Sequence, residues 1–205
     1  MGLLNELQET AKRDDVLTLL QQAKLVSAKL GCKDICRWLE HEQNGYPDAD
    51  AVPRYRLIPV TLCYKTNGPA RAGGGQSGNG IVPLSGIVKG CENPMIRSIS
   101  EVLLLVEAVK SGQGMYIPLP PEVTKSLHGA LKCNKPEMLH QVTFMAQLDS
   151  SRVHAIPEQI TSKVLDWVCD LEAAGVTGDE QSFSDNEKQA AQTVVFNIDN
   201  SKSVS

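Results

Sequence analysis

Five polar side chains that could act together on a ligand lie within one short stretch, residues 42–56: Glu42, Asn44, Tyr46, Tyr55 and Arg56. A carboxylate such as Glu42 can act as a general base, and a guanidinium such as Arg56 can hold a phosphate. The same two groups have a structural interpretation, in which they form an ion pair that pins the loop to the strand after it. An open cleft between them would favour catalysis, whereas burial and mutual pairing would argue against it.

Aromatic residues point to the same stretch of the chain. They make up only 4% of the sequence, and Trp38, Tyr46, Tyr55 and Tyr64 all fall between residues 38 and 64. Because aromatic residues are scarce in this chain, their concentration here singles out this corner as the place to look for a site. The candidate binding residues are therefore Trp38, Glu42, Asn44, Gly45, Tyr46, Tyr55 and Arg56.

Known catalytic and phosphate-binding motifs are missing from the sequence. It contains neither GxSxG nor HExxH, and no lysine follows a glycine within the glycine-rich segment 66–80 as a P-loop requires. That segment lies between two apparent strands, which predicts a long hairpin loop. An alternative is a lid over the candidate binding residues that orders when a ligand binds. No catalytic residue is assigned.

The cysteines do not form a recognisable metal site. Cys32 and Cys36 lie on one helical face and His41 follows, but no second closely spaced pair completes four ligands. Without a secretory signal, the six cysteines are expected to be reduced thiols. The sequence therefore predicts neither a metal ion nor a cofactor.

The sequence pattern around the candidate residues predicts an α+β fold. Apolar residues at three- and four-residue steps predict helices over 16–30 and 33–44, joined at Gly31 into an N-terminal helical hairpin. A strand follows over 55–65, and Pro59 within it predicts an edge position or a bulge. Later segments add a strand at 81–84, helices over 93–112 and from Pro157, and a strand over 139–148. These elements predict a small, mostly antiparallel sheet with further packing helices.

Charge and composition change towards the carboxy-terminal end. Residues 57–135 carry 8 basic and 4 acidic side chains, net +4, whereas residues 136–205 carry 4 and 11, net −7. We expect a globular domain over 1–175 and an acidic polar tail over 176–205, which forms an edge strand or binds a partner. The charge pattern gives no nucleic-acid footprint. The absence of a long apolar run and of a signal peptide predicts a cytoplasmic protein without a membrane span.

The run LVSAKLGCKDICRWLEHEQNGYPDADAVPRYR resembles the start of the AbiTii domain family. The resemblance extends more weakly through the helices at 98–107 and 157–171, and Gln43 departs from it where the family more often has leucine. The motif positions are Leu30-Gly31, Trp38, Glu42, Asn44-Gly45-Tyr46 and Pro53-Arg54-Tyr55-Arg56. The resemblance implies a bacterial cytoplasmic protein of abortive infection, a defence against phage, and implies no catalytic residues.

Two functional hypotheses remain open at this point. One is a non-enzymatic sensing or assembly module that contacts a protein partner, associates with itself, or binds a nucleotide or another small anionic ligand. The alternative is a toxin enzyme acting on RNA or a nucleotide, with Glu42, Tyr46, Tyr55 and Arg56 as its polar groups. The absence of a catalytic motif makes the first hypothesis the preferred one.

Overall fold

The structure is a computed structural model of the chain, and it describes residues 2–13, 15–66, 81–83, 91–110, 114–130, 142–178 and 182–198. The described residues form an α+β fold, with amino-terminal helices, a small antiparallel sheet and further helices, which confirms the predicted fold class. The chain divides into two compact units: Met1–Leu57, Pro94–Glu107 and Ser151–Ser205 make the first, and Ile58–Asn93 and Ala108–Ser150 make the second. No helix in the described part of the chain is long and apolar enough to cross a membrane.

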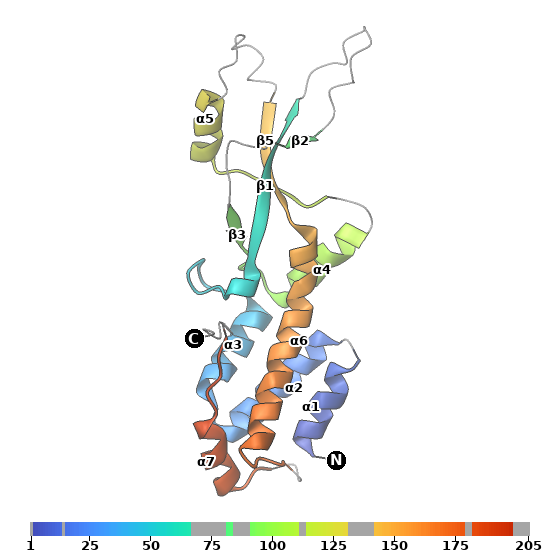
Figure 1. Cartoon of the computed structure of the whole chain (residues 1–205), viewed down its shortest axis with the longest axis vertical. Helices are drawn as coiled ribbons and strands as arrows, with labels where there is room; N and C mark the ends of the chain where they lie inside the picture. Colours follow the sequence, from blue (N-terminus) through green and yellow to red (C-terminus); the bar gives the residue numbers. More distant parts are fainter. Residues whose placement is uncertain are drawn as a thin grey trace, which may run out of the picture. The chain divides into compact units, whose positions relative to one another are not determined.

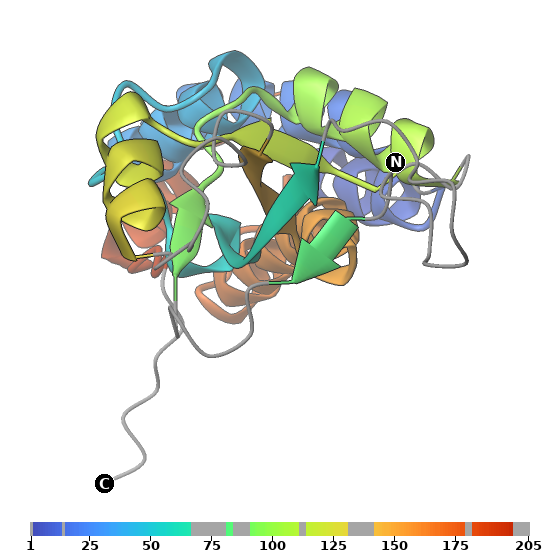
Figure 2. The same cartoon turned by 90° about the horizontal axis from the view of Figure 1, so that it is seen from above.

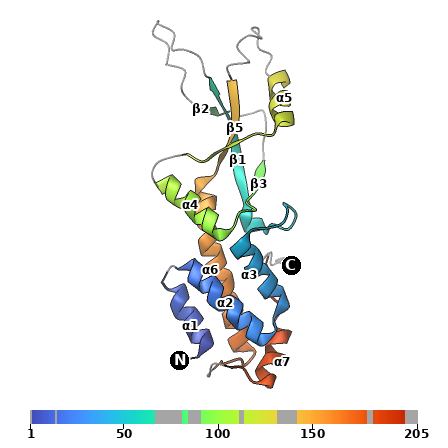
Figure 3. The same ribbon diagram turned by 180° about the vertical axis from the view of Figure 1, so that it is seen from behind.

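The first unit is built around helices, which Figures 1 and 3 show side by side. Helix α2 packs against α1, α3 and α7. The leucines on the facing sides of α1 and α2 are at most 1% exposed: Leu4, Leu7, Leu19, Leu20 and Leu30. The helices that contribute to this unit are α1 (Leu3–Ala11), α2 (Val16–Leu30), α3 (Lys33–Asn44), α4 (Ile99–Lys110), α6 (Ser150–Ala173) and α7 (Asp185–Thr193).

The predicted helical hairpin is confirmed by α2 and α3. Asp15 caps α2, because its carboxylate accepts a hydrogen bond from the Thr18 backbone N–H at 3.1 Å. Gly31 ends α2 with φ +75°, a left-handed conformation that favours glycine. The short turn directs α3 back along α2, so the Trp38 and Glu42 side chains face the interior.

The helix predicted to start at Pro157 starts earlier, at Ser150. Proline inside a helix removes a backbone hydrogen bond and costs about 3 kcal/mol. Val153 and Ile156, which precede the proline in α6, are both 0% exposed. Burial of each such side chain contributes about 1.5–3 kcal/mol, which offsets the lost hydrogen bond and keeps the first turns helical.

The second unit contains the sheet, with strands in the order β2-β1-β5-β4 and with β3 also paired to β1. Leu62 of β1, Leu127 of α5 and Phe144 of β5 form one buried cluster, so α5 (Pro121–Ala130) covers this face of the sheet (Figure 2). The strands are β1 (Leu57–Thr66), β2 (Ile81–Pro83), β3 (Glu92–Pro94), β4 (Tyr116–Pro118) and β5 (Val142–Leu148).

The edge position predicted from Pro59 is wrong. Strand β1 pairs with β5 on one side and with β2 and β3 besides, so it lies inside the sheet. The ladder with β5 begins at Val60, one residue after the proline, and the Pro59 carbonyl accepts from the Asp149 backbone N–H at 2.9 Å. Pro59 is tolerated because the paired ladder does not require a donor from it.

The helix predicted over 93–112 is also shorter at its start. Residues 92–94 form β3, and α4 begins at Ile99. Ser98 and Glu101 form a capping box, in which the Glu101 carboxylate accepts from the Ser98 backbone N–H at 3.0 Å and Ser98 Oγ accepts from the Glu101 N–H at 3.3 Å. The cap fixes the start of α4, so residues 94–98 lie outside the helix. Their backbone groups can therefore bond to Tyr46 and Arg56.

Beyond α6, Ser184 and Glu187 form a capping box at the start of α7. The segment 194–197 that follows α7 is not in a strand. The division into a domain over 1–175 and a tail over 176–205 stays a prediction, and the glycine-rich segment 66–80 lies, apart from Thr66, outside the described residues.

Glu187 gives the first unit a pH-dependent stability. Its carboxylate accepts hydrogen bonds from the backbone N–H groups of Gly178 (3.0 Å), Ser184 (2.8 Å) and Thr177 (3.1 Å), which lower its pKa from 4.5 to about 2. A lowered folded-state pKa contributes stability above the unfolded pKa of 4.5, and this contribution is lost as the pH falls towards 2. Glu187→Ala should therefore lower the free energy of unfolding, measured in urea at pH 7, by about 1 kcal/mol.

The difference between wild type and Glu187→Ala should shrink as the pH falls from 4.5 towards 2. Glu158→Ala, at an exposed position on α6, serves as the control and should show no such convergence. A Glu187→Ala deficit that is as large near pH 2 as at pH 7 would contradict the assignment.

Candidate functional site

The Glu42 carboxylate is the centre of a buried hydrogen-bond network in the first unit. Glu42 and Arg56 are both 0% exposed, and Tyr46 is 7% exposed. Oε1 of Glu42 accepts from the hydroxyls of Tyr46 and Tyr55 and from Nε of Arg56 at 3.1 Å. Oε2 accepts from Nε of Arg56 at 3.1 Å and from Nη2 of the same side chain. The lone pairs of both carboxylate oxygens are therefore occupied.

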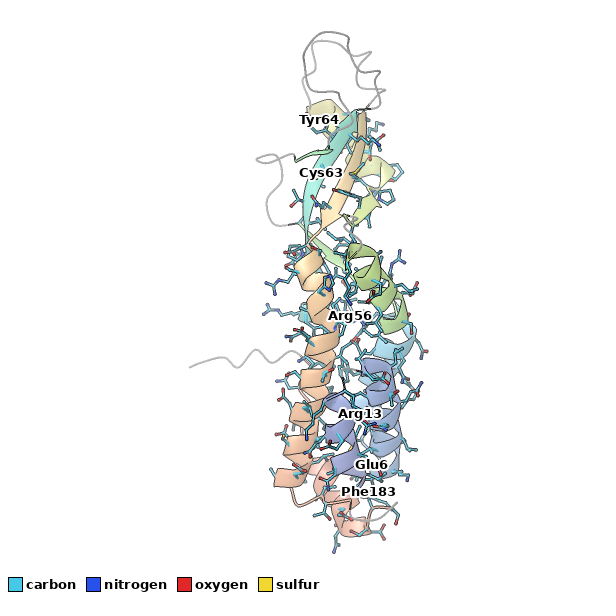
Figure 4. All side chains as sticks on the ribbon, turned by 90° about the vertical axis from the view of Figure 1, so that its right-hand side faces the viewer. Glu6, Arg13, Arg56, Cys63, Tyr64 and Phe183 are labelled. Carbon is cyan, nitrogen blue, oxygen red and sulfur yellow. The ribbon has the colours of Figure 1, made fainter. Side chains whose placement is uncertain are left out.

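Arg56, labelled in Figure 4, also binds the segment that leads into α4. It comes from the 3-10 turn η1 (Arg54–Arg56), which directly precedes β1. Its Nη1 donates to the carbonyls of Met95 at 3.0 Å and Arg97 at 2.7 Å, and its own carbonyl accepts from the Met95 N–H at 2.9 Å. Burial lowers the pKa of Arg56, but the charge of Glu42 and the hydrogen bonds to it raise that pKa by more. The guanidinium therefore stays charged and joins α3, η1 and residues 95–97.

Tyr55 connects the network to Trp38 and to α6. Its hydroxyl donates to Glu42 and accepts from Trp38 Nε1 at 3.0 Å. The ammonium of Lys163, on α6, lies 5.5 Å from the Tyr55 ring centroid, which is within the range of a cation–π contact. Burial and the neighbouring Glu42 charge raise the pKa of Tyr55 well above its usual value, so this hydroxyl remains protonated.

Tyr46 connects the network to the surface. Burial, and then the Glu42 charge, raise the pKa of its hydroxyl well above the usual range. The Arg56 guanidinium lies 5.3 Å from the Tyr46 ring centroid, and the His41 ring stacks on Tyr46 at 5.2 Å with an interplanar angle of 18°. The Tyr46 ring therefore lies between a buried charge and a partly exposed imidazole.

An open pocket of about 750 Å³ lies at this surface. Its wall includes Ile96 and Arg97, whose exposed fractions are 44% and, for the arginine side chain, 55%. The Tyr46 backbone N–H donates to the Ile96 carbonyl at 2.8 Å, which holds the two sides of the pocket together. The lining residues are His41, Asn44, Gly45, Tyr46, Pro47, Ile96, Arg97, Ser98 and Glu101.

The structure therefore separates the candidate binding residues into two groups. Trp38, Glu42, Tyr55 and Arg56 lie in the buried network, Asn44 and Gly45 line the pocket, and Tyr46 belongs to both. That these residues bind a ligand stays a prediction. Among the described residues, no group of three or more His, Cys, Asp or Glu side chains is placed to hold a metal ion.

The arrangement is better suited to fixing geometry than to proton transfer. A general base needs an accessible lone pair within reach of the substrate proton. Both oxygens of Glu42 are paired, and the Arg56 groups that would hold a phosphate are bound to Glu42 and to backbone carbonyls. A buried polar network that is satisfied in this way makes one packing arrangement specific.

Residues contributed by distant parts of the chain were missed by the sequence reasoning. Ile96 and Arg97 line the pocket, and Lys163 contacts Tyr55, although they lie about 40 to 110 positions away from the cluster. A local signal existed for the first two. Pro94 and the capping box at Ser98 and Glu101 mark 94–98 as the segment before a helix rather than the helix itself.

Comparison with known proteins identifies the family of the chain. The AbiTii family model matches residues 2–196, nearly the whole chain, including both the network and the pocket. No curated protein matches the sequence, and no solved structure matches it either. The name AbiTii points to abortive infection, the defence of bacteria against phage. The resemblance found in the sequence from Leu30-Gly31 to Arg56 is confirmed, and the chain belongs to the AbiTii family.

Proposed function

We propose that this chain acts in phage defence in the bacterial cytoplasm as a non-enzymatic sensing or assembly module. It works through contacts with a protein partner, made at the pocket beside Tyr46. The observation that carries the proposal is the complete internal pairing of Glu42 and Arg56, both 0% exposed.

The network supports this function by holding the pocket wall in place. Arg56 fixes the carbonyls of Met95 and Arg97, and Tyr46 fixes that of Ile96, so the exposed side chains of residues 96 and 97 project from an anchored backbone. A surface that is ordered before binding loses less conformational entropy on association. The pocket is therefore suited to recognising a partner of complementary shape.

The chemistry of the pocket favours a protein over a small anion. Arg97 Nη1 lies 3.7 Å from Glu101 Oε1, so the positive charge at the pocket is balanced by a carboxylate. Ile96 adds an exposed apolar side chain, and arginine and tyrosine are enriched among the residues that dominate protein interfaces. A nucleotide or another small anionic ligand is the alternative occupant that the experiment below distinguishes.

The toxin-enzyme alternative finds less support in this geometry. It requires Glu42, Tyr46, Tyr55 and Arg56 to face a substrate, and three of them are at most 7% exposed. An enzyme would need the network to open, which would leave a buried charge without its partner. The non-enzymatic hypothesis needs no such opening.

Substitutions at the pocket test the proposal in cells. We expect Arg97→Ala and Asn44→Ala to reduce protection against phage, measured as efficiency of plating, by at least about tenfold, because losing an interface contact of about 1.4 kcal/mol lowers affinity tenfold. Both side chains are exposed, so the melting temperature should stay close to that of wild type.

Lys12→Ala, at the exposed residue directly after α1, whose side chain does not line the pocket, is the matched control and should protect as wild type does. Full protection by both pocket variants would overturn the assignment of the pocket. Binding of free nucleotides to the wild type in calorimetry, abolished by Arg97→Ala, would favour the small anionic ligand over the protein partner.

A further inference from the structure

A second groove in the first unit lies on α3 and α6, and the chain's own segment 194–196 occupies it. Figures 1 and 3 show the chain leaving α7 and running alongside α3. The groove, with about 450 Å³ of open space beside the segment, includes the start of α3 and Trp167 of α6. Its lining residues are Gly31, Cys32, Lys33, Asp34, Ile35, Trp167, Ala191, Gln192, Val194, Val195 and Phe196.

The aromatic ring of Phe196 is the main anchor of this segment. Its centroid lies 5.0 Å from that of Trp38, with the rings tilted by 49°. Val195, next to it, is 83% exposed, whereas Val194 and Phe196 are partly buried. Alternate side chains of an extended chain point to opposite sides, and Val194 has extended backbone angles, φ −75° and ψ 116°. The groove therefore holds the side chains of Val194 and Phe196 and leaves the residue between them exposed, which is a Val-x-Phe pattern.

The backbone of residues 194–196 contributes less to the attachment of this segment than its side chains do. Within the described part of the chain, residues 194–196 make one backbone–backbone hydrogen bond. The Val194 N–H donates to the Ala191 carbonyl at 3.2 Å, and this bond belongs to the end of α7. The side chains of Val194 and Phe196 thus supply most of the attachment. An extended segment attached mainly by side chains can be replaced by another segment with the same side chains.

We propose that this groove is a protein-binding site for an extended partner segment carrying Val-x-Phe, and that residues 194–196 fill it in cis until the partner displaces them. The partner's aromatic ring would take the place of Phe196 on Trp38. This groove shares no lining residue with the pocket beside Tyr46, and binding of a partner segment to it does not depend on a role in phage defence.

The two tryptophans of the chain make this exchange directly measurable. Trp38 contacts Phe196 and Trp167 lines the groove, and they are 1% and 2% exposed. Phe196→Ala in the full chain should move tryptophan emission to longer wavelength. Leu25→Ser is the matched control, because this apolar side chain of α2 is 53% exposed and does not line the groove, and its emission should equal that of wild type.

The binding experiment uses a fluorescein-labelled peptide with the sequence of residues 193–198, Thr-Val-Val-Phe-Asn-Ile, and a second peptide with alanine in place of phenylalanine. A segment tethered in cis competes at an effective concentration of the order of millimolar. We therefore expect Phe196→Ala to bind the first peptide at least about tenfold more tightly than wild type or Leu25→Ser. The peptide should restore the emission, and the alanine peptide should not bind.

Equal peptide affinity in Phe196→Ala and wild type, or no binding to either, would overturn the proposal. If Phe196→Ala fails to fold, Phe196→Leu keeps an apolar side chain and should bind the peptide more tightly than wild type; equal affinity there would also overturn it. A wild-type dimer in light scattering that Phe196→Leu abolishes would overturn the foreign partner in favour of a second copy of the chain.

Discussion

Arg56→Ala is expected to lower the free energy of unfolding by about 3–5 kcal/mol, the usual cost of removing one partner of a buried ion pair. Glu42 would keep its two tyrosine donors but lose the charge that balances it at 0% exposure. The carbonyls of Met95 and Arg97 would lose a donor at the same time. Urea unfolding followed by circular dichroism measures the change.

Two further variants test whether the unpaired charge of the Glu42–Arg56 ion pair causes this loss of stability. Arg56→Met combined with Glu42→Leu should be less destabilised than Arg56→Ala alone, because no unpaired charge remains in the interior. Arg97→Ala removes an exposed guanidinium nearby and should change stability by no more than about 0.5 kcal/mol. A double variant that is less stable than Arg56→Ala would show that the ion pair is not the source of the effect.

Gly45→Ala is the second substitution with a large expected effect, about 3 kcal/mol or more of lost stability. Gly45 ends α3 with φ +92° and ψ 163°, a region that is almost restricted to glycine. A Cβ atom there would lie 2.8 Å from the Ile96 carbonyl oxygen and 3.3 Å from the Ser98 backbone nitrogen. Both neighbours are backbone atoms of the pocket wall, so the clash cannot be relieved by a side-chain rotation.

Gly31→Ala is the matched control for this prediction. Gly31 also has a positive φ, +75°, but a Cβ atom there would meet only the end of the Gln192 side chain, at 3.8 Å. We expect a loss of about 1–2 kcal/mol from the left-handed conformation alone. The two variants can be compared by thermal and urea unfolding. Equal losses in the two variants would mean that the close approach of Gly45 to residues 96–98 does not contribute to stability.

The local parts of the fold could be predicted from the sequence because their signals are local. Asp15 and Gly31 mark the ends of α2, and Ser98 with Glu101 marks the start of α4. The position of β1 could not be predicted from Pro59, because strand order depends on pairing with residues about 80 positions away in β5. The start of α6 depended on the burial of Val153 and Ile156, which periodicity does not determine.

The candidate site was predictable in its members but not in its organisation. The sequence placed Glu42, Tyr46, Tyr55 and Arg56 close together, and the structure joins all four. Whether the group faces solvent depends on residues 94–98 and on α6, which come from elsewhere in the chain. The Phe196 contact with Trp38 had no local signal beyond the short apolar run around it.

The most direct test of the non-enzymatic account is the efficiency of plating of phage on cells that express Tyr55→Phe. This change removes one donor to Glu42 and one acceptor for Trp38, costing about 1–3 kcal/mol of stability, and leaves the pocket residues intact. If the network only fixes geometry, cells with matched amounts of folded protein should be protected as well as with wild type. A loss of protection by about a hundredfold or more, the typical effect of removing a group that takes part in proton transfer, would contradict the account.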